Sequence, residues 1–442
     1  MQIAKWKERS REIAEKGKRM KDNVYRILKE RGFIYQTTDD EALERLLGKK
    51  RVTCYIGFDA TADSLHVGSL VPIMGLVHMQ RCGHRPIALL GGGTTSVGDP
   101  SGRTEMRKLL TRREIDAYGE KIKTQFARYL SFDEGKALLL NNADWLLPLN
   151  YIEFLRDIGR HFSVNRMLAT ESVRSRLETG LSFLEFNYML LQAYDFYIQA
   201  RDYDCELQMG GQDQWGNIVA GVDLTRRMLG KQVYGITFPL ITTSGGEKFG
   251  KSAGNAVWLD RKKTSVFDFY QYWRNVDDRD VEKYLGLFTL LPMEEVKRLP
   301  KENVNRAKEI LGFELTRLAH GKEEAAKVYT AAAKQFGLSD PGEEVKTSSA
   351  IIDVHPETKA AIPTMEMKKS ALKEGLWVVK LFVESGLCRS NGEARRLIQQ
   401  GGAYVNDSVV EDENLELTSK DLVDGALTLR AGKKRYKRAV FV

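Results

Sequence analysis

The stretch that decides the fold is residues 52–69, VTCYIGFDATADSLHVGS. Its apolar start, residues 52–56, is typical of a buried strand, and a helix is predicted to follow over residues 68–81. A second apolar run, residues 86–90, predicts another strand. A strand, a helix and a strand within this length form a βαβ unit, and such units predict a parallel sheet.

The same patterns extend along the chain. A helix is predicted over 22–31, and another begins after Thr38, which is a plausible N-cap. Further strands are predicted at 138–140 and 205–209, so the first half of the chain is α/β. From about 264 to 335 the pattern becomes helical and rich in charge. A stretch with Pro, Gly and Ser follows and is typical of a linker.

Composition narrows the class of protein. A chain of 442 residues is too long for one core, so two to four domains are expected. No apolar run approaches the length of a membrane span, so no membrane contact is expected. Four scattered cysteines offer neither metal-ligand spacing nor a disulfide framework, which favours a cytoplasmic protein.

Basic residues gather at the two ends of the chain. Residues 1–21 hold eight Lys or Arg against three Glu, and residues 433–438 read KKRYKR, within a formal net charge of +8. Basic ends around a near-neutral body indicate contacts with a polyanion. The alternative is a pair of solvated termini.

Residues 57–69 lead from the first strand into the first crossover helix. A helix N-terminus presents unpaired N–H groups and partial positive charge, which suit a phosphate. His66 can add a donor there, and Gly68 permits close approach of a nucleotide. Taken alone, this His-x-Gly sequence also fits a strand-to-helix turn capped by the histidine.

Residues 245–252, GGEKFGKS, match the Walker A expression G-x-x-x-x-G-K-[ST]. A true P-loop runs directly into a helix, whereas the next residues, AGNAVW, are a poor helix start. We therefore interpret the segment as a glycine-rich loop that presents Lys248 and Lys251 to a polyphosphate. The alternative is a basic surface loop.

Polar side chains recur on one face of an otherwise apolar helix. Tyr188, Gln192 and Asp195 have spacings of four and three, which place them together. They suit a small ligand with an apolar body, although a core helix with internally paired polar groups is the alternative. Glycine turns at 91–93 and 210–211 follow strands, where open α/β sheets bind ligands, but such turns are often structural.

Together these motifs resemble the tyrosyl member of the class I aminoacyl-tRNA synthetases, of bacterial type. That class has a HIGH motif opening a helix and a KMSKS loop after the sheet, and residues 66–69 (HVGS) and 248–252 (KFGKS) are similar to them. The tyrosyl type is indicated by residues 55–59 (YIGFD), 98–102 (GDPSG), 192–195 (QAYD) and 211–215 (GQDQW). The resemblance runs from about residue 23 to the end.

The resemblance implies a set of site residues. The tyrosine-binding residues would be Tyr55 and Asp195 at the phenol, Asp99, Tyr188 and Gln192 at the ammonium, and Gln214 near the carboxylate. The ATP-binding residues would be Asp59 and Gly68, with Gly57 and Asp213 near the ribose. The catalytic residues around the polyphosphate would be Thr61, His66, Arg103, Arg107, Lys248 and Lys251, of which His66, Lys248 and Lys251 also bind ATP.

Two positions depart from the family motifs. Ser69 stands in place of the second HIGH histidine, which weakens the case for the usual contact with the nucleotide sugar. Gly250 stands at the third KMSKS position and should make the loop more flexible. Neither change removes a phosphate-facing group, so activity is expected.

The C-terminal residues indicate a second kind of binding. Residues 390–393, SNGE, read as a capping box that opens a short helix, and a strand follows at about 404. The segment resembles the αL-type RNA-binding module shared with some ribosomal proteins. Arg389, Arg395 and Arg396 would contact RNA phosphates. The alternative is a small solvated appendage.

The expected fold class is α/β, with a Rossmann-like parallel sheet in the catalytic domain, then a helical domain and a small α+β RNA-binding module. The expected parts are a basic N-terminal extension (1–21), the catalytic domain (22–260) with the loop 248–252, the helical domain (261–340), a linker (341–371) and the RNA-binding module (372–442).

The resemblance implies that tyrosine is activated with ATP and passed to the terminal adenosine of tRNA(Tyr). ATP would arrive with Mg²⁺ as co-substrate; no tightly bound cofactor, no protein-held metal and a homodimer are expected. Three rivals are an inactive RNA-binding protein with the synthetase fold, a P-loop ATPase or kinase, and the tryptophanyl type. The last is disfavoured because Tyr55 and Asp195 suit a phenol.

Overall fold

The structure is a computed structural model. It describes residues 23–101, 110–177, 180–245, 251–252, 255–356, 364–372, 375–406, 408–423, 425–432 and 435–441. The expected N-terminal extension, 1–21, lies outside the described residues. The chain divides into two compact units, Met1–Val328 with Ser339–Ile352 and Tyr329–Leu338 with Asp353–Val442. No helix within the described ranges is long and apolar enough to cross a membrane.

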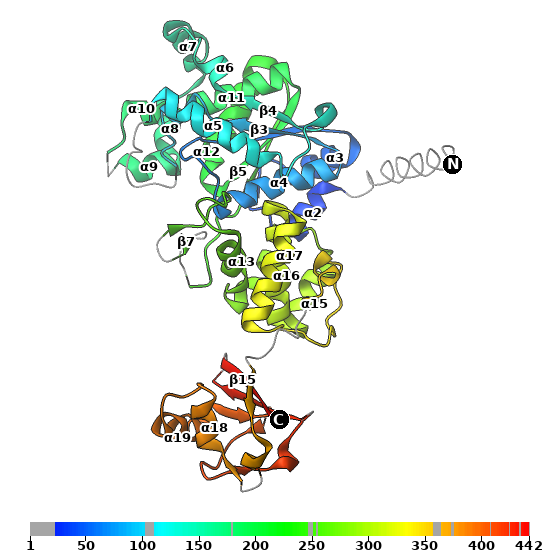
Figure 1. The fold of residues 1–442 in the computed structure, drawn as a ribbon. Helices are drawn as coiled ribbons and strands as arrows, with labels where there is room; N and C mark the ends of the chain where they lie inside the picture. The colour runs from blue at the N-terminus through cyan, green and yellow to red at the C-terminus, as the bar shows by residue number, and fades with distance from the viewer. Residues whose placement is uncertain are drawn as a thin grey trace, which may run out of the picture. The chain divides into compact units, whose positions relative to one another are not determined.

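A six-stranded sheet, of which Figure 1 labels β3, β4 and β5, forms the centre of the larger unit. Its strand order is β1-β6-β5-β2-β3-β4. The strands are β1 (Gln36–Thr37), β2 (Thr53–Phe58), β3 (Arg85–Leu90), β4 (Leu138–Asn141), β5 (Cys205–Gly211) and β6 (Tyr234–Phe238). Strands β2 to β6 are parallel, and β1 pairs antiparallel with β6 at the edge. The predicted α/β class and the parallel sheet are confirmed.

Helices cover both faces of this sheet. The crossover helix α4 (Leu70–Arg81) and α5 (Arg112–Phe126) lie on one face, where the rings of Phe58 and Phe126 pack edge to face at 4.8 Å. Helix α11 (Tyr188–Asp202) lies on the other, where Phe196 packs against Tyr55 at 5.4 Å. Tyr55 and Phe58 point to opposite layers because side chains alternate along a strand.

Two short helices precede the sheet, α2 (Val24–Glu30) and α3 (Asp40–Lys49). The prediction that Thr38 caps α3 is wrong, because the Asp39 carboxylate accepts the N–H of Ala42 at 2.9 Å. Thr38 Oγ1 instead accepts the N–H of Gly235 at 3.0 Å, beside the edge strand. Both residue types can cap a helix, and edge-strand pairing decides between them.

The remaining helices of the larger unit fall into two groups. Those between β4 and β6 are α6 (Ala143–Leu146), α7 (Tyr151–Asp157), α8 (Val164–Ala169), α9 (Glu171–Leu177), α10 (Phe183–Phe186) and α12 (Trp215–Leu229). Those after the sheet are α13 (Val266–Arg274), α14 (Val281–Phe288), α15 (Met293–Glu302), α16 (Val304–His320) and the start of α17 (Lys322–Phe336), whose residues from Tyr329 on are assigned to the smaller unit. In this second group the fully buried Trp273 of α13 packs against α14, and its ring lies 5.2 Å from that of Phe288.

The Walker A match does not lead into a helix. Strand β7 (Lys251–Ser252) pairs antiparallel with β8 (Asn255–Ala256), so a tight two-stranded ribbon stands where a P-loop would start its helix. The decision against a P-loop is therefore confirmed by the backbone.

The smaller unit is an α+β module. Its sheet has the order β12-β11-β14-β15-β9, in which β15 and β9 are parallel and the other pairs antiparallel. The elements are β9 (Thr364–Met367), β10 (Leu376–Trp377), α18 (Val378–Glu384), α19 (Asn391–Gln399), β11 (Ala403–Val405), β12 (Ser408–Val409), β13 (Glu416–Leu417), β14 (Ala426–Ala431) and β15 (Arg435–Phe441). Residues from α18, α19, β11 and β14 share one apolar core.

The capping box predicted at the start of α19 is only half present. Ser390 Oγ accepts the N–H of Glu393 at 3.3 Å, as expected. The Glu393 carboxylate, however, accepts the N–H of Arg389 at 2.8 Å, one residue before the cap. The Glu393 side chain therefore does not bond to the N–H of Ser390, as a capping box requires, but holds the residue before it, Arg389.

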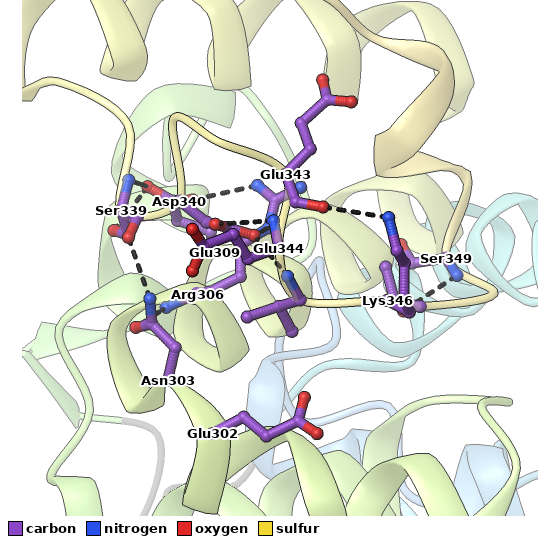
Figure 2. Close-up of polar contacts among 12 residues, drawn as sticks. Glu302, Asn303, Arg306, Glu309, Ser339, Asp340, Glu343, Glu344, Lys346 and Ser349 are labelled. Atoms are coloured by element: carbon purple, nitrogen blue, oxygen red, sulfur yellow. Dashed lines mark hydrogen bonds and ion pairs between the residues drawn. The ribbon is translucent and has the colours of Figure 1, made fainter.

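Residues 339–349, which we call the strap, lie on α16 and are held there by buried charges (Figure 2). Glu309 Oε1 accepts the N–H and Oγ of Ser339 at 3.0 and 2.7 Å, while its Oε2 accepts Arg306 Nη1 at 3.1 Å. Asp340 accepts the backbone N–H groups of Glu344 and Val345 at 3.1 and 2.9 Å. The first residues of the expected linker thus belong to the larger unit.

The far end of the strap has a comparable anchor. Ser349 Oγ donates to Glu314 Oε1 at 2.6 Å and accepts the N–H of Ile351 at 3.2 Å. Both Ser349 and Glu314 are buried. When a buried carboxylate loses a hydrogen-bond donor, the protein loses more stability than when an exposed carboxylate does, because water cannot replace the lost bond.

We predict that Ser349→Ala lowers the free energy of unfolding by about 1–3 kcal/mol, because it leaves Glu314 short of a donor. The matched control is Ser348→Ala, whose side chain is exposed and which should change stability by less than about 0.5 kcal/mol. Urea unfolding of the full chain measures both. Equal losses in the two variants would show that the strap is not held in this way.

Candidate active site

The sheet has one point at which its connections diverge. The chain passes from β2 outward to β3 and β4, and from β5 outward to β6 in the opposite direction, while β2 and β5 are neighbours. Open α/β sheets bind ligands outside the carboxyl ends of the strands at such a switch point. A cavity of about 320 Å³ lies at this position, lined by residues that follow or end β2, β3, β4 and β5.

The cavity brings together most of the sequence-predicted site residues. These are Tyr55, Gly57, Asp59, Thr61, His66, Asp99, Tyr188, Gln192, Asp195, Asp213 and Gln214. Arg103, Arg107 and Lys248 lie outside the described residues, and only the backbone of Lys251 is described. Arg389, Arg395 and Arg396 are exposed in the smaller unit, around the start of α19. Their roles stay predictions.

The inner end of the cavity holds a buried carboxylate. Asp195 is 2% exposed and accepts Asn142 Nδ2 at 2.9 Å and Trp145 Nε1 at 2.7 Å. Burial raises its pKa to about 7, although the two hydrogen bonds act in the opposite direction. The nearby hydroxyl of Tyr55 is buried without a hydrogen-bond partner among the described residues. A ligand hydroxyl can therefore find both a donor and an acceptor here.

Two further carboxylates make the cavity acidic. Asp59 accepts Tyr188 OH at 3.2 Å and Thr94 Oγ1 at 2.9 Å. Asp99 accepts Gln214 Nε2 at 2.6 Å and the N–H of Ser101 at 2.9 Å. Burial raises the pKa of Asp99 to about 6, and the charge of Asp59 adds to the rise. A cationic group between these carboxylates would relieve their repulsion.

His66 lies exposed at the mouth of the cavity. Its Nδ1 accepts the N–H of Gly68 at 3.0 Å, so the neutral ring carries its proton on Nε2 and can donate it to a ligand. Partial removal from water lowers the pKa of His66 and favours this neutral form.

Gly68 is not among the cavity's lining residues. A Cβ at this position would lie 2.6 Å from His66 Cε1, so the glycine makes room for the histidine ring. The close approach of a nucleotide to Gly68 that the sequence predicts is a separate point and stays a prediction.

Sequence reasoning missed three polar residues that hold the predicted ones, and a fourth polar residue that lines the cavity. Asn142 and Trp145 bind Asp195, and Asn142 also donates to Thr94 Oγ1 at 3.0 Å. Asn217 donates to Gln192 Oε1 at 3.1 Å and to Gln214 Oε1 at 3.2 Å. Asn142 could have been found, because it follows the strand predicted at 138–140. Gln208, buried on β5 with its Oε1 unpartnered in the described structure, gave no signal.

The described side chains offer no ready metal site: no group of three or more His, Cys, Asp or Glu among them is arranged to hold an ion. The cavity is acidic at its inner end, which suits a small ligand that carries a cationic group. A histidine at its mouth can donate a hydrogen bond.

Two family models match the chain. The model for class I tRNA synthetases of the tryptophan and tyrosine type covers residues 48–337. The model for the SYY-like C-terminal domain of tyrosine–tRNA ligase covers residues 356–439.

Similar proteins and structures agree with these matches. A tyrosine–tRNA ligase of Desulfosudis oleivorans is 57% identical over 427 residues, which are 95% of this chain and 99% of that protein. One of Caldanaerobacter subterraneus subsp. tengcongensis is 52% identical over 419 residues, 94% and 98% of the two chains. A C-terminally truncated mitochondrial tyrosyl-tRNA synthetase of Aspergillus nidulans superposes with a TM-score of 0.65 at 32% identity, over 71% of this chain and 94% of that one. Its fold, its site and these likenesses place the chain in the tyrosyl branch of the class I tRNA synthetase family.

Proposed function

We propose that this chain activates L-tyrosine with ATP and transfers the tyrosyl group to the terminal adenosine of tRNA(Tyr). The observation that carries the proposal is the inner end of the cavity, where Asp195 and the Tyr55 hydroxyl, which has no hydrogen-bond partner among the described residues, both line the space and would receive a phenol group. A phenol oxygen supplies both a donor and an acceptor, which an indole ring does not.

In the proposed site the substrate ammonium lies near Asp99, Tyr188 and Gln192. The tyrosine carboxylate attacks the α-phosphate of ATP, a new C–O–P linkage forms, and pyrophosphate leaves. Charge builds on the leaving phosphates, where His66, Thr61 and the cations Arg103, Arg107, Lys248 and Lys251 would stabilise it. Catalysis then comes from positioning and electrostatics, without a covalent enzyme intermediate. Gly57, Asp59 and Asp213 would hold the nucleotide, and Mg²⁺ would accompany ATP as counter-charge.

In the second step a ribose hydroxyl of the tRNA attacks the tyrosyl carbonyl, and AMP leaves. The proposed RNA contacts are Arg389, Arg395 and Arg396 of the smaller unit. Arg395 lies over the Trp377 ring at 5.4 Å and 4.0 Å from Glu413, so RNA would compete with partners inside the module. Arg389 and Arg396 are exposed and would meet phosphates more directly.

We also propose a cytoplasmic homodimer. Large apolar side chains are exposed on the helices that follow β4, including Ile152 at 69% and Phe183 at 70%. Such exposure favours a protein contact. The four cysteines, Cys54, Cys82, Cys205 and Cys388, are widely scattered along the chain, which suits a reducing compartment.

We predict that Tyr55 and Asp195 select tyrosine over phenylalanine. Without the substrate hydroxyl both groups would stay buried and unpaired, which is costly. ATP–pyrophosphate exchange with each amino acid in turn should respond to tyrosine alone, and Tyr55→Phe and Asp195→Asn should narrow the preference. The control is Tyr129→Phe, because Tyr129 OH is also buried and unpartnered among the described residues but does not line the cavity. Equal exchange with tyrosine and phenylalanine in the native chain would contradict the proposal.

We predict that Lys251→Ala slows adenylate formation but leaves tyrosine binding nearly intact. Loss of one group that meets developing charge costs roughly 2–4 kcal/mol of activation free energy in comparable sites. Stopped-flow adenylate formation and equilibrium dialysis separate the two quantities, with the exposed Lys262→Ala as control. A fall in tyrosine affinity as steep as the fall in rate would make Lys251 structural.

We predict that removal of residues 372–442 abolishes charging of tRNA but spares adenylate formation. The proposed ATP and tyrosine residues all precede residue 252, and the shortened chain keeps the strap. RNA binding should weaken and lose salt dependence because phosphate contacts are gone. Residues 1–371 are purified, checked for folding, and assayed for pyrophosphate exchange and charging separately. Comparable losses in both assays would mean that the module only stabilises the body.

A further inference from the structure

We propose that the ion pair between Asp63 and Lys263 positions His66 for adenylate formation. Asp63 and Lys263 are then positioning residues that act through Trp258. The inference rests on the proposed function for the role of His66, and on described contacts for the rest.

Two segments far apart in sequence are paired through their backbones at His66. The N–H of Val67 donates to Val257 O at 2.9 Å, and the N–H of Leu259 donates to Leu65 O at 2.9 Å. Between these bonds, His66 and Trp258 form an isolated antiparallel bridge. The segment that follows the β7–β8 ribbon is therefore attached to the segment that carries the histidine.

Side chains add a second attachment between the same segments. The rings of His66 and Trp258 meet edge to face at 6.1 Å. Lys263 Nζ lies 4.6 Å from the centroid of the Trp258 ring and forms an ion pair with Asp63. Asp63 comes three residues before His66, so the contacts run from Asp63 through Lys263 and Trp258 back to His66.

The backbone pairing fixes where the two segments meet, but it leaves the Trp258 ring able to rotate about its side-chain bonds, and a contact on the ring itself restricts that rotation. The Lys263 charge has a carboxylate on one side and an indole face on the other, so it holds the Trp258 ring in place against His66. Without this charge the backbone pairing remains, but the ring that borders His66 loses its outer support. If a group that stabilises charge in the transition state is displaced even slightly, the reaction rate falls substantially.

The exposure of the Asp63–Lys263 pair argues that it positions His66 and does not act mainly by stabilising the whole fold. The side chains of Asp63 and Lys263 are 23% and 34% exposed, and pairs this exposed add little to global stability. Asp63 also pairs with Lys121 of α5 at 3.0 Å, and among the described contacts it is Lys263, not Lys121, that lies over the Trp258 ring. Lys121 therefore provides a matched control.

The test compares Asp63→Asn, Lys263→Met, the double variant, Lys263→Arg and Lys121→Met in the full chain. Single-turnover adenylate formation should slow roughly tenfold in Asp63→Asn and Lys263→Met, while equilibrium tyrosine affinity stays unchanged. The double variant should be no slower than either single one, because both remove the same contact. Lys263→Arg keeps the charge and should stay near the native rate, and Lys121→Met should stay within about twofold.

A second readout does not depend on activity. The ring C–H signals of His66 in NMR spectra should shift or broaden in Asp63→Asn and Lys263→Met but not in Lys121→Met. If native protein shows no tyrosine-dependent exchange, the proposed function fails, while unchanged His66 signals would overturn the positioning claim on its own. Single-variant rates near native, effects that multiply in the double variant, or a parallel loss of tyrosine affinity would also overturn it.

Discussion

The parallel pairing of β2 with β5 is the constraint on which the rest of the site depends. Tyr55 of β2 stands in register with Gln208 of β5, and β2 is paired on its other edge with β3. A strand held on both edges cannot shift, so the residues that follow its carboxyl end have fixed positions. Helix α11, which covers one face of the sheet, adds Tyr188, Gln192 and Asp195 to the same cavity.

Local patterns made much of this arrangement predictable. The βαβ unit and the three polar residues of α11 each lie within one short segment. Within such a segment the periodicity of the sequence indicates which face of the strand or helix each side chain occupies. The partners of Asp195 could not be predicted, because Asn142 and Trp145 precede it by 53 and 50 residues and meet it only through the fold. The choice between Thr38 and Asp39 as a cap likewise depended on a strand about 200 residues away. Contacts of this kind leave no periodic signal.

Buried carboxylates have two different uses in this chain. Glu309 on α16 accepts bonds from Ser339 and Arg306, so its charge is matched inside the protein and it holds the strap. Among the residues that the structure describes, Asp195 and Asp99 accept hydrogen bonds only from neutral groups, and burial raises the pKa of both. These carboxylates are all buried, and they differ in whether their hydrogen-bond partners include a charged side chain. A buried carboxylate that forms an ion pair stabilises the structure, whereas one without a cationic partner is a candidate for binding a ligand.

The hydroxyl of Tyr55, which is buried and finds no partner in the described part of the chain, has a consequence for the whole molecule. A buried polar group without a bond makes the empty protein less stable than it would be with that bond. Any ligand that completes the bond binds the native state and not the unfolded chain, so its free energy of binding adds to that of folding. Resistance of the protein to heat or proteolysis is therefore tied to the concentration of its amino-acid substrate, and a cell starved of that amino acid would hold a more fragile enzyme.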